Sequence, residues 1–140
     1  VLNIGTVGTT KYHVGDIIVA KHFVDRDYDK LRAYGVESEI EFQQIEGMHL
    51  PSIVEGKETC TDMIVNTGDD FVTAESVIRG DVVDMEAYAL ATACKRLGVP
   101  MVSVKYVTDL IGQNSLQQWE EKLSEARMAL KVYFDKYFYA

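Results

Sequence analysis

Two carboxylates in one stretch of the chain, Glu86 and Asp109, are the side chains best placed to do chemistry. Glu86 lies where a short apolar strand at 82–83 changes into a helix over 85–97, and Asp109 comes just after a second strand over 101–107. Ligands of open α/β sheets bind at the carboxyl ends of the strands, so both acids belong to one functional edge. A carboxyl group with a raised pKa can donate a proton, whereas an ionised one accepts hydrogen bonds from hydroxyl groups.

The elements around these acids predict the fold class. The helix over 85–97 carries many small residues, which let a helix lie close to a sheet, and Gly98 and Pro100 end it. The strand over 101–107 is apolar and β-branched at most positions, as in strands covered on both faces. This strand–helix–strand order predicts an α/β fold with a mixed or largely parallel sheet between helices. Crossovers of this kind are right-handed.

The rest of the chain is assigned from local pattern. Ser115 with Gln118 predicts a capping box, and apolar residues at three- and four-residue spacing over 116–137 predict one long helix with a packed stripe. The aromatic residues near the end, over 133–139, exceed what one helix face buries and suggest a covering partner. The other predicted elements are a strand over 1–4, a turn over 5–9, a strand over 17–24, a charged loop over 25–46, a strand over 59–65, a polar loop over 67–71 and a short helix over 73–79.

Composition limits the classes of partner. The 140 residues include 14 Lys and Arg against 22 Asp and Glu, a formal net charge of −8. This acidic balance argues against nucleic acid or an acidic membrane surface as a partner, and the sequence contains no apolar stretch long enough to predict a membrane-spanning helix. Cys60 and Cys94 lack metal-ligand spacing and are expected to be reduced, buried thiols of a cytoplasmic protein. The length fits one domain over 1–140.

Three motifs in the same order resemble one family. The stretch VVDMEAYALATAC (82–94), followed by GVPMVSVKYVTD (98–109), resembles the nucleoside phosphorylase and nucleosidase superfamily, and is most similar to the 5′-methylthioadenosine/S-adenosylhomocysteine nucleosidases. LNIGTVGT (2–9) with VGDIIVA (14–20), and TGDDFV (67–72), resemble two further motifs of that family. The resemblance implies a three-layer α/β sandwich, with a mixed sheet flanked by helices, and no cofactor or metal. Since the chain starts without Met inside an apolar run, we expect a family domain that lacks its amino-terminal portion.

The resemblance also implies roles for the two acids in cleaving a purine N-glycosidic bond. Asp109 would protonate the departing base near N7 as a general acid, and Glu86 would accept hydrogen bonds from the ribose hydroxyls. Met85 would pack on the ribose, and Phe71, with the backbone of Val72, would stack on the base and hydrogen-bond it. Without the resemblance, simpler interpretations remain: a strand-end aspartate, a glutamate that complements the helix dipole, and core packing for the two apolar side chains.

Other candidate ligand contacts surround this pair. Thr6, Val7 and Gly8 belong to the predicted glycine-rich turn, where the backbone can approach a ligand closely. The resemblance implies that Thr6 and Lys105 help to hold the attacking water, although Lys105 stands where the family usually has Arg and is a point charge, not a planar fork. Lys105 could alternatively be a strand-end lysine that reaches solvent. Tyr34 resembles the aromatic residue that enters the pocket of a neighbouring subunit, or is a loop tyrosine.

The resulting prediction is an enzyme that hydrolyses 5′-methylthioadenosine or S-adenosylhomocysteine, releases adenine, and works as a homodimer or larger homo-oligomer. Two alternatives stay open: a purine nucleoside phosphorylase, which uses phosphate instead of water, and a nucleoside-binding relative without catalysis. In this family the glutamate that activates water and most phosphate-binding arginines belong to the amino-terminal portion, so the chain alone is expected to be inactive. Asp84, where the family motif has Glu, is a second departure beside Lys105.

Overall fold

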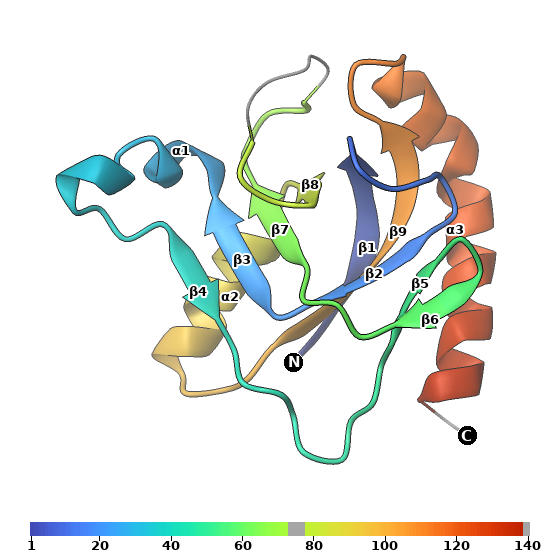
Figure 1. Cartoon of the computed structure of the whole chain (residues 1–140), viewed down its shortest axis with the longest axis horizontal. Helices are drawn as coiled ribbons and strands as arrows, with labels where there is room; N and C mark the ends of the chain where they lie inside the picture. The colour runs from blue at the N-terminus through green and yellow to red at the C-terminus, as the bar shows by residue number, and fades with distance from the viewer. Residues whose placement is uncertain (73–77, 139–140) are drawn as a thin grey trace.

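A single mixed β-sheet, with helices packed against it, organises the computed structural model, which describes residues 1–72 and 78–138 (Figure 1). The elements are β1 (Leu2–Thr9), β2 (Ile17–Ala20), β3 (His22–Asp25), α1 (Arg26–Asp29), the 3₁₀ helix η1 (Arg32–Tyr34), β4 (Glu39–Glu41), β5 (Ser52–Val54), β6 (Lys57–Thr59), β7 (Ile64–Thr67), β8 (Val82–Asp84), α2 (Ala87–Arg96), β9 (Val102–Leu110) and α3 (Ser115–Tyr137). The strands lie in the order β4-β3-β7-β8-β1-β9-β2-β5-β6. β1 is parallel to β9, and β7 is parallel to both β3 and β8, while the other neighbouring pairs are antiparallel.

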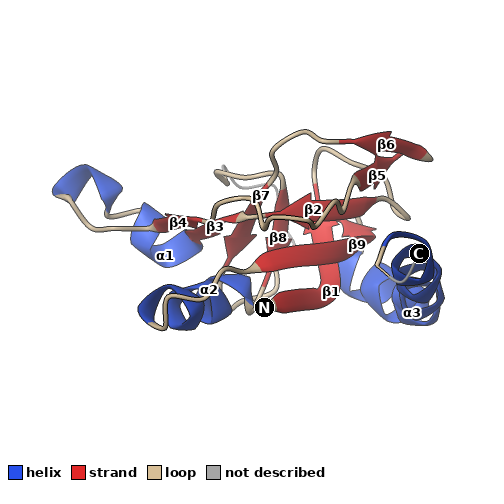
Figure 2. Ribbon diagram, turned by 90° about the horizontal axis from the view of Figure 1, so that it is seen from below, coloured by secondary structure: helices blue, strands red, loops and turns tan. Residues whose placement is uncertain are grey.

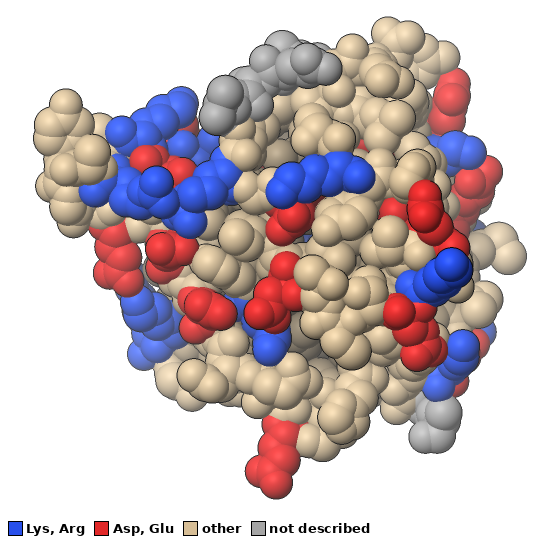
Figure 3. Space-filling view, in the orientation of Figure 1, with Lys and Arg blue, Asp and Glu red and all other residues tan. Residues whose placement is uncertain are grey.

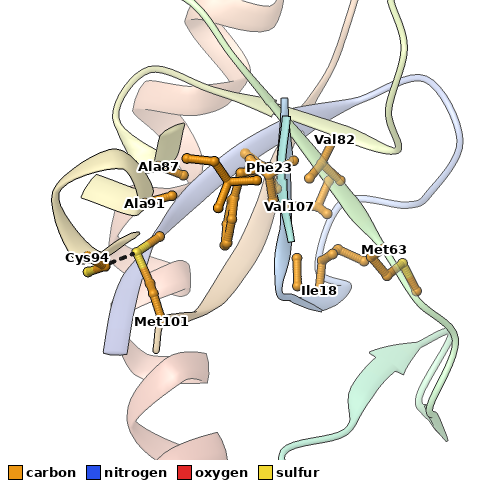
Figure 4. Close-up of a cluster of buried hydrophobic side chains, with 13 residues drawn as sticks. Ile18, Phe23, Met63, Val82, Ala87, Ala91, Cys94, Met101 and Val107 are labelled. Carbon is orange, nitrogen blue, oxygen red and sulfur yellow. Dashed lines mark hydrogen bonds between the residues drawn. The ribbon is translucent and has the colours of Figure 1, made fainter. Parts of the chain in front are cut away.

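The strand predicted over 17–24 is divided in the structure. Its first half, β2, pairs with β9, and its second half, β3, pairs with β7, with Lys21 between them. Since these partners lie on opposite sides of β1 in the strand order, the sheet has to curl around the side chains of one face. Ile18, Phe23 and Val107, which come from three different strands, are fully buried together in that space (Figure 4).

Two helices cover opposite faces of the central strand β9. Val107 packs in one core cluster with Ala91 of α2, whereas Val104 and Tyr106 pack in a second cluster with Leu130 of α3. Side chains of a strand alternate between its faces, and Figure 2 shows α2 and α3 on either side of β1 and β9. The predicted three-layer α/β sandwich, a mixed sheet flanked by helices, is therefore confirmed.

Helix α2 follows the prediction closely. Its small residues Ala87, Ala91 and Cys94 are buried against the sheet, and Gly98 beyond its end has the left-handed φ of 66°. The sulfur of Cys94 lies 3.9 Å from the sulfur of Met101, on the left of the close-up in Figure 4. The other thiol departs from the prediction.

Cys60 is exposed, because the strand expected over 59–65 does not form as one piece. β6 ends at Thr59 and β7 begins at Ile64, so Cys60 lies on the connection between them. The charged segment over 25–46 likewise contains the short elements α1, η1 and β4, and is not loop throughout. The helix predicted over 73–79 falls mostly on 73–77, outside the described residues.

The predicted turn over 5–9 is wrong, since β1 continues through it to Thr9. Parallel pairing with β9 engages the backbone from Leu2 onwards, so the small residues belong to a central strand. The glycines of this stretch serve another purpose, which is clearance for two charged side chains.

The predicted capping box at the start of α3 is also wrong. Asn114 precedes the helix with a left-handed φ of 52°, and Ser115 is already helical. The Ser115 hydroxyl donates to the carbonyl of Val72 at 3.4 Å, and Gln118 Oε1 accepts the backbone N–H of Leu110 at 2.8 Å. Both side chains therefore tie the helix to segments that border the candidate site.

The apolar stripe of α3 is packed mainly in its second half. Ala126, Leu130 and Tyr133 are buried, whereas Leu116 and Leu123 are 52% and 40% exposed. The aromatic end of the helix is covered in part by β5 and the segment before it, and the Tyr133 hydroxyl donates to the carbonyl of Pro51 at 2.8 Å. None of the helices that the structure describes has both the length and the apolar character needed to cross a membrane.

Candidate active site

One cavity, of about 220 Å³, collects all the predicted site residues except Lys105 and Tyr34. It lies at the carboxyl ends of β1 and β9, beside the start of α2. Its walls are formed by Thr6, Val7, Gly8, Arg26, Asp70, Phe71, Val72, Val83, Asp84, Met85, Glu86, Asp109 and Trp119. The position at strand ends is where ligands bind in α/β sheets, as the sequence predicts.

Asp109 is buried near the end of β9, not beyond the strand as expected. A register shift between β1 and β9 pairs Val7 with Val107 but Gly8 with Asp109, so that Thr108 is the extra residue of a bulge. A Cβ on Gly8 would lie 2.6 Å from Asp109 Oδ2, so glycine is the residue that leaves this carboxyl its place. Burial raises the pKa of Asp109, although the Thr108 hydroxyl, which donates to Oδ1 at 2.7 Å, acts in the opposite direction.

The carboxylate of Glu86 is available to the cavity because other side chains accept the hydrogen bonds of the first backbone N–H groups of α2. The backbone N–H of Ala87 donates to Asp84 Oδ2 at 3.0 Å, and that of Tyr88 donates to Thr67 Oγ1 at 3.1 Å. Within the described residues, Glu86 makes no capping hydrogen bond of its own, although it occupies the N-cap position. Its side chain is half exposed, at 50%, and lines the cavity.

Lys105 lies behind the cavity wall with its side chain fully buried. Its Nζ is 2.8 Å from Glu86 Oε1 and 3.1 Å from Asp84 Oδ2, so one ammonium forms an ion pair with both acids. A Cβ on Gly5 would lie 3.1 Å from this Nζ, so the glycine of β1 gives the ammonium its room. The interpretation as a strand-end lysine that reaches solvent is wrong, since its exposed fraction is 0%.

Asp84 is the most heavily engaged acid of the site. Its side chain is 1% exposed and accepts from Lys105, from Ala87 N and, at 2.5 Å, from the Thr67 hydroxyl. Burial raises the pKa of this carboxyl, while Lys105 and the Thr67 hydrogen bond lower it in part. Asp84 therefore helps to build the start of the helix and fixes the ammonium that contacts Glu86.

Trp119 belongs to the apolar stripe predicted over 116–137, but it lines the cavity. Its indole N–H donates to Thr6 Oγ1 at 3.2 Å, and its ring stands edge-on to Phe71 with 6.2 Å between the ring centres. The helical spacing that places Trp119 in the stripe is real, but the first part of α3 borders the cavity and not the core. Nothing in the spacing distinguishes these two surroundings.

Arg26 and Asp70 were also missed. Arg26 begins α1 and reaches the cavity wall, where its Nη1 donates to Asn66 Oδ1 and its Nη2 to the carbonyl of Asp70, both at 3.2 Å. In the sequence they belong to a charged segment and a polar loop, where charge ordinarily indicates a solvated surface. Two positions 44 residues apart come together only through the pairing of β3 with β7.

Tyr34 lies away from the cavity, on η1, with 84% of its surface exposed. The α1–η1 segment projects beside β3 and β4 in Figure 1 and also exposes Tyr28 and Leu31. Lys and Arg side chains gather over this end of the face seen in Figure 3. Arg79 forms an ion pair with Asp29 of α1, with 2.7 Å between Nη2 and Oδ1. The predicted contact of Tyr34 with a neighbouring subunit stays a prediction.

A second hollow, of about 410 Å³, is larger but lies at the other end of β9. Its wall includes Val102, the first residue of β9, whereas Asp109 stands near the last. The charged residues of its wall include the exposed Glu58 and Asp62. The smaller cavity, which holds buried carboxyls against a buried cation, is therefore the candidate active site.

The fold and the site together define an α/β protein that presents carboxyl groups to a small cavity at the strand ends. The model of the Phosphorylase superfamily matches residues 1–138, and the chain belongs to this family. A 5′-methylthioadenosine/S-adenosylhomocysteine nucleosidase of Geobacillus sp. (strain WCH70) is 26% identical over 90% of the chain and 62% of its own length. The chain thus spans less than two thirds of that relative.

Solved structures share the fold. The chain is similar to the 5′-methylthioadenosine nucleosidase of Arabidopsis thaliana, with a TM-score of 0.73, 20% identity, and coverage of 96% of this chain and 59% of the other. It is also similar to the 5′-methylthioadenosine/S-adenosylhomocysteine nucleosidase of Helicobacter pylori with butyl-thio-DADMe-Immucillin-A, with a TM-score of 0.69, 20% identity, and coverage of 96% and 67%. At this identity, the likeness supports the α/β architecture.

Proposed function

We propose that the protein hydrolyses the N-glycosidic bond of purine nucleosides, with 5′-methylthioadenosine and S-adenosylhomocysteine as the first substrates to test. The observation that carries this proposal is the pairing of two different carboxyls on one cavity. Asp109 is 4% exposed and its pKa is raised, whereas the Glu86 side chain is half exposed and contacts a cation. Two carboxyls in unlike surroundings suit an acid and a charge-stabilising group.

Asp109 would act on the departing base. Cleavage leaves electrons on the purine, and protonation at N7 makes the base a better leaving group. A carboxyl that burial keeps protonated to higher pH can supply this proton. Phe71 would stack on the base and the Val72 backbone would hydrogen-bond it, so the part of the cavity beside Asp70, Phe71 and Val72 is called the base end.

Glu86 would bind the ribose hydroxyls at the other part of the cavity, the ribose end, formed by Thr6, Met85 and Glu86. As the bond breaks, positive charge develops on the sugar. The interaction of a nearby carboxylate with the sugar is therefore stronger in the transition state than in the ground state. Lys105 would act through Glu86, since its ammonium contacts Oε1 at 2.8 Å and lies behind the wall. Thr6 would assist the water that attacks the sugar.

The surroundings of Lys105 favour hydrolysis over phosphorolysis. The resemblance assigns this position to holding water or phosphate, and a phosphate dianion needs a cation free to bind it. Here the ammonium is already shared by Asp84 and Glu86, and two carboxylates beside it would repel a further anion. A phosphorylase remains the second candidate and a nucleoside-binding protein without turnover the third.

The whole protein would then work as a homo-oligomer in which the exposed Tyr34 meets a second copy. The α1–η1 segment, with Tyr28, Leu31 and Tyr34 on its surface, supports this proposal. Purine and methionine salvage in the cytoplasm is the matching cellular role. The ligand is a small molecule, and the net charge of −8 gives nucleic acid or an acidic membrane little attraction.

The decisive assay measures release of free base by the whole protein with and without inorganic phosphate. We expect adenine from 5′-methylthioadenosine in phosphate-free buffer, at a rate that added phosphate leaves unchanged. Strict dependence on phosphate would refute the hydrolytic mechanism in favour of the phosphorylase. Tight nucleoside binding without any release of base would favour the third candidate.

A further inference from the structure

Arg26 is a partly buried cation at the base end, and its surroundings balance its charge poorly. Its side chain is 12% exposed, yet its carboxylate partner, Asp70, is 83% exposed and 3.4 Å from Nη2. Water screens an ion pair whose carboxylate is exposed, so Asp70 neutralises little of the guanidinium charge. Its remaining bonds go to the neutral oxygens of Asn66 and the Asp70 backbone.

The guanidinium also has donors to spare. It carries five N–H groups in a rigid plane. Its Nε is buried, and no partner for it is found among the described residues. The two terminal nitrogens each carry two N–H groups, and each nitrogen donates one hydrogen bond within the described residues, Nη1 to Asn66 and Nη2 to the carbonyl of Asp70. Since Arg26 lines the cavity, a ligand oxygen that accepts a hydrogen bond from a remaining terminal N–H gains a charge-assisted hydrogen bond.

The position of Arg26 is set by close packing. A Cβ on Gly68 would lie 2.4 Å from the guanidinium, so the group rests directly on the backbone at the start of the loop that carries Phe71. Together with Asn66 and Asp70, this contact holds the cation against the cavity wall. A donor held this firmly can discriminate between ligands, because it cannot easily turn away from an unfavourable group.

We propose that Arg26 is a specificity-determining residue that favours purines with a carbonyl oxygen at position 6 over purines with an amino group there. A carbonyl oxygen accepts a hydrogen bond from the guanidinium, whereas an amino group presents another donor and leaves both groups unpaired. This inference rests on the proposed function, which places the base beside Asp70, Phe71 and Val72. It departs from the adenine nucleosides after which the similar nucleosidases are named.

The test compares 5′-methylthioinosine with 5′-methylthioadenosine, which differ at position 6 of the base. We expect the whole protein to cleave the 6-oxo compound with the higher kcat/KM, by about 10- to 100-fold, the range of one hydrogen bond to a charged group. Arg26→Met should bring the ratio of the two kcat/KM values near one. Arg26→Lys should keep part of the preference, and Arg32→Ala, on the same segment but exposed, should leave the ratio unchanged.

The ratio separates recognition of the base from damage to the loop. If Arg26 only positions Phe71, its loss slows both substrates equally and the ratio stays constant, which overturns the inference. A wild-type preference for the amino compound overturns it as well. If neither nucleoside is cleaved, the proposed function fails, and calorimetric binding of free hypoxanthine and adenine to the wild type and Arg26→Met then decides the role of Arg26 by the same ratio.

Discussion

The two ends of the cavity are held in different ways. At the ribose end, Lys105 and Asp84 are 0% and 1% exposed and lie on β9 and β8, the strands on either side of β1. At the base end, Arg26 meets an acid, Asp70, that is 83% exposed and sits on a loop. A buried pair depends strongly on both partners, whereas an exposed pair contributes little. The ribose end is therefore part of the folded core, and the base end can change its specificity at small cost in stability.

The largest expected effect is the loss of the buried cation. Lys105→Met leaves Asp84 as an uncompensated buried carboxylate, which should lower the free energy of unfolding by about 3–5 kcal/mol. Urea denaturation of the whole protein measures it. The double variant with Asp84→Asn removes both charges and should recover a large part of the loss. A reduction below about 1 kcal/mol in the single variant, within the range of surface pairs, would contradict the comparison.

A smaller effect is expected from the glycine beside the acid. Gly8→Ala sets a methyl group 2.6 Å from Asp109 Oδ2, and relief of that clash should cost about 1–3 kcal/mol of stability and displace the carboxyl. In an Asp109→Ala background the obstacle is gone, so the same change should be nearly neutral. Denaturant midpoints of the four proteins complete the cycle. An equal cost in both backgrounds would show that Asp109 is not the cause.

The raised pKa of Asp109 predicts how stability depends on pH. A carboxyl whose pKa is higher in the folded than in the unfolded chain binds more protons when folded, so stability falls as pH rises from its ordinary value of 3.8 through the folded pKa. Asp109→Asn removes this loss. Its melting temperature should exceed that of the wild type near neutral pH, and the difference should shrink in acid. A constant difference across pH would argue against a raised pKa.

The smallest effect belongs to the exposed acid of the base end. Asp70→Asn removes a screened partner of Arg26 and should change the free energy of unfolding by about 0–1 kcal/mol. Asp84→Asn is the matched comparison at the ribose end and should be clearly more destabilising. Both are measured by urea denaturation under one set of conditions. Equal losses would mean that the two ends are held alike.

The sequence predicted the site residues at the ends of regular strands better than it predicted Arg26 and Asp70, for a physical reason. Glu86 lies just after β8 and Asp109 lies near the end of β9. The apolar, β-branched pattern of these strands is local, so the place of both acids at one sheet edge could be inferred. Arg26 and Asp70 meet because β3 pairs with β7, a contact between segments that no local pattern connects. Short-range pattern therefore reaches residues at the ends of regular elements, and it stops where loops are joined by tertiary pairing.

The errors in the fold have a similar origin. Gly5 and Gly8 suggest a turn by type, yet β9 pairs with the whole stretch and the glycines leave room for Lys105 and Asp109. Ser115 and Gln118 match a capping box by spacing, but their side chains bind Val72 and Leu110 instead. In each case a tertiary partner determined the outcome that local propensity left open.

The most direct test of the account is the pH dependence of kcat/KM for purine nucleoside cleavage by the whole protein and its Asp109→Asn variant. The wild type should lose activity on an alkaline limb, above the ordinary carboxyl pKa of 3.8, as Asp109 loses its proton. The Asp109→Asn variant should turn over about 10²–10⁴-fold more slowly and should lack the alkaline limb. The Glu86→Gln variant should lose both binding and rate but should retain the alkaline limb. Near-normal turnover by a well-folded Asp109→Asn protein would contradict the account, because Asp109 would then be a structural residue at the end of a strand.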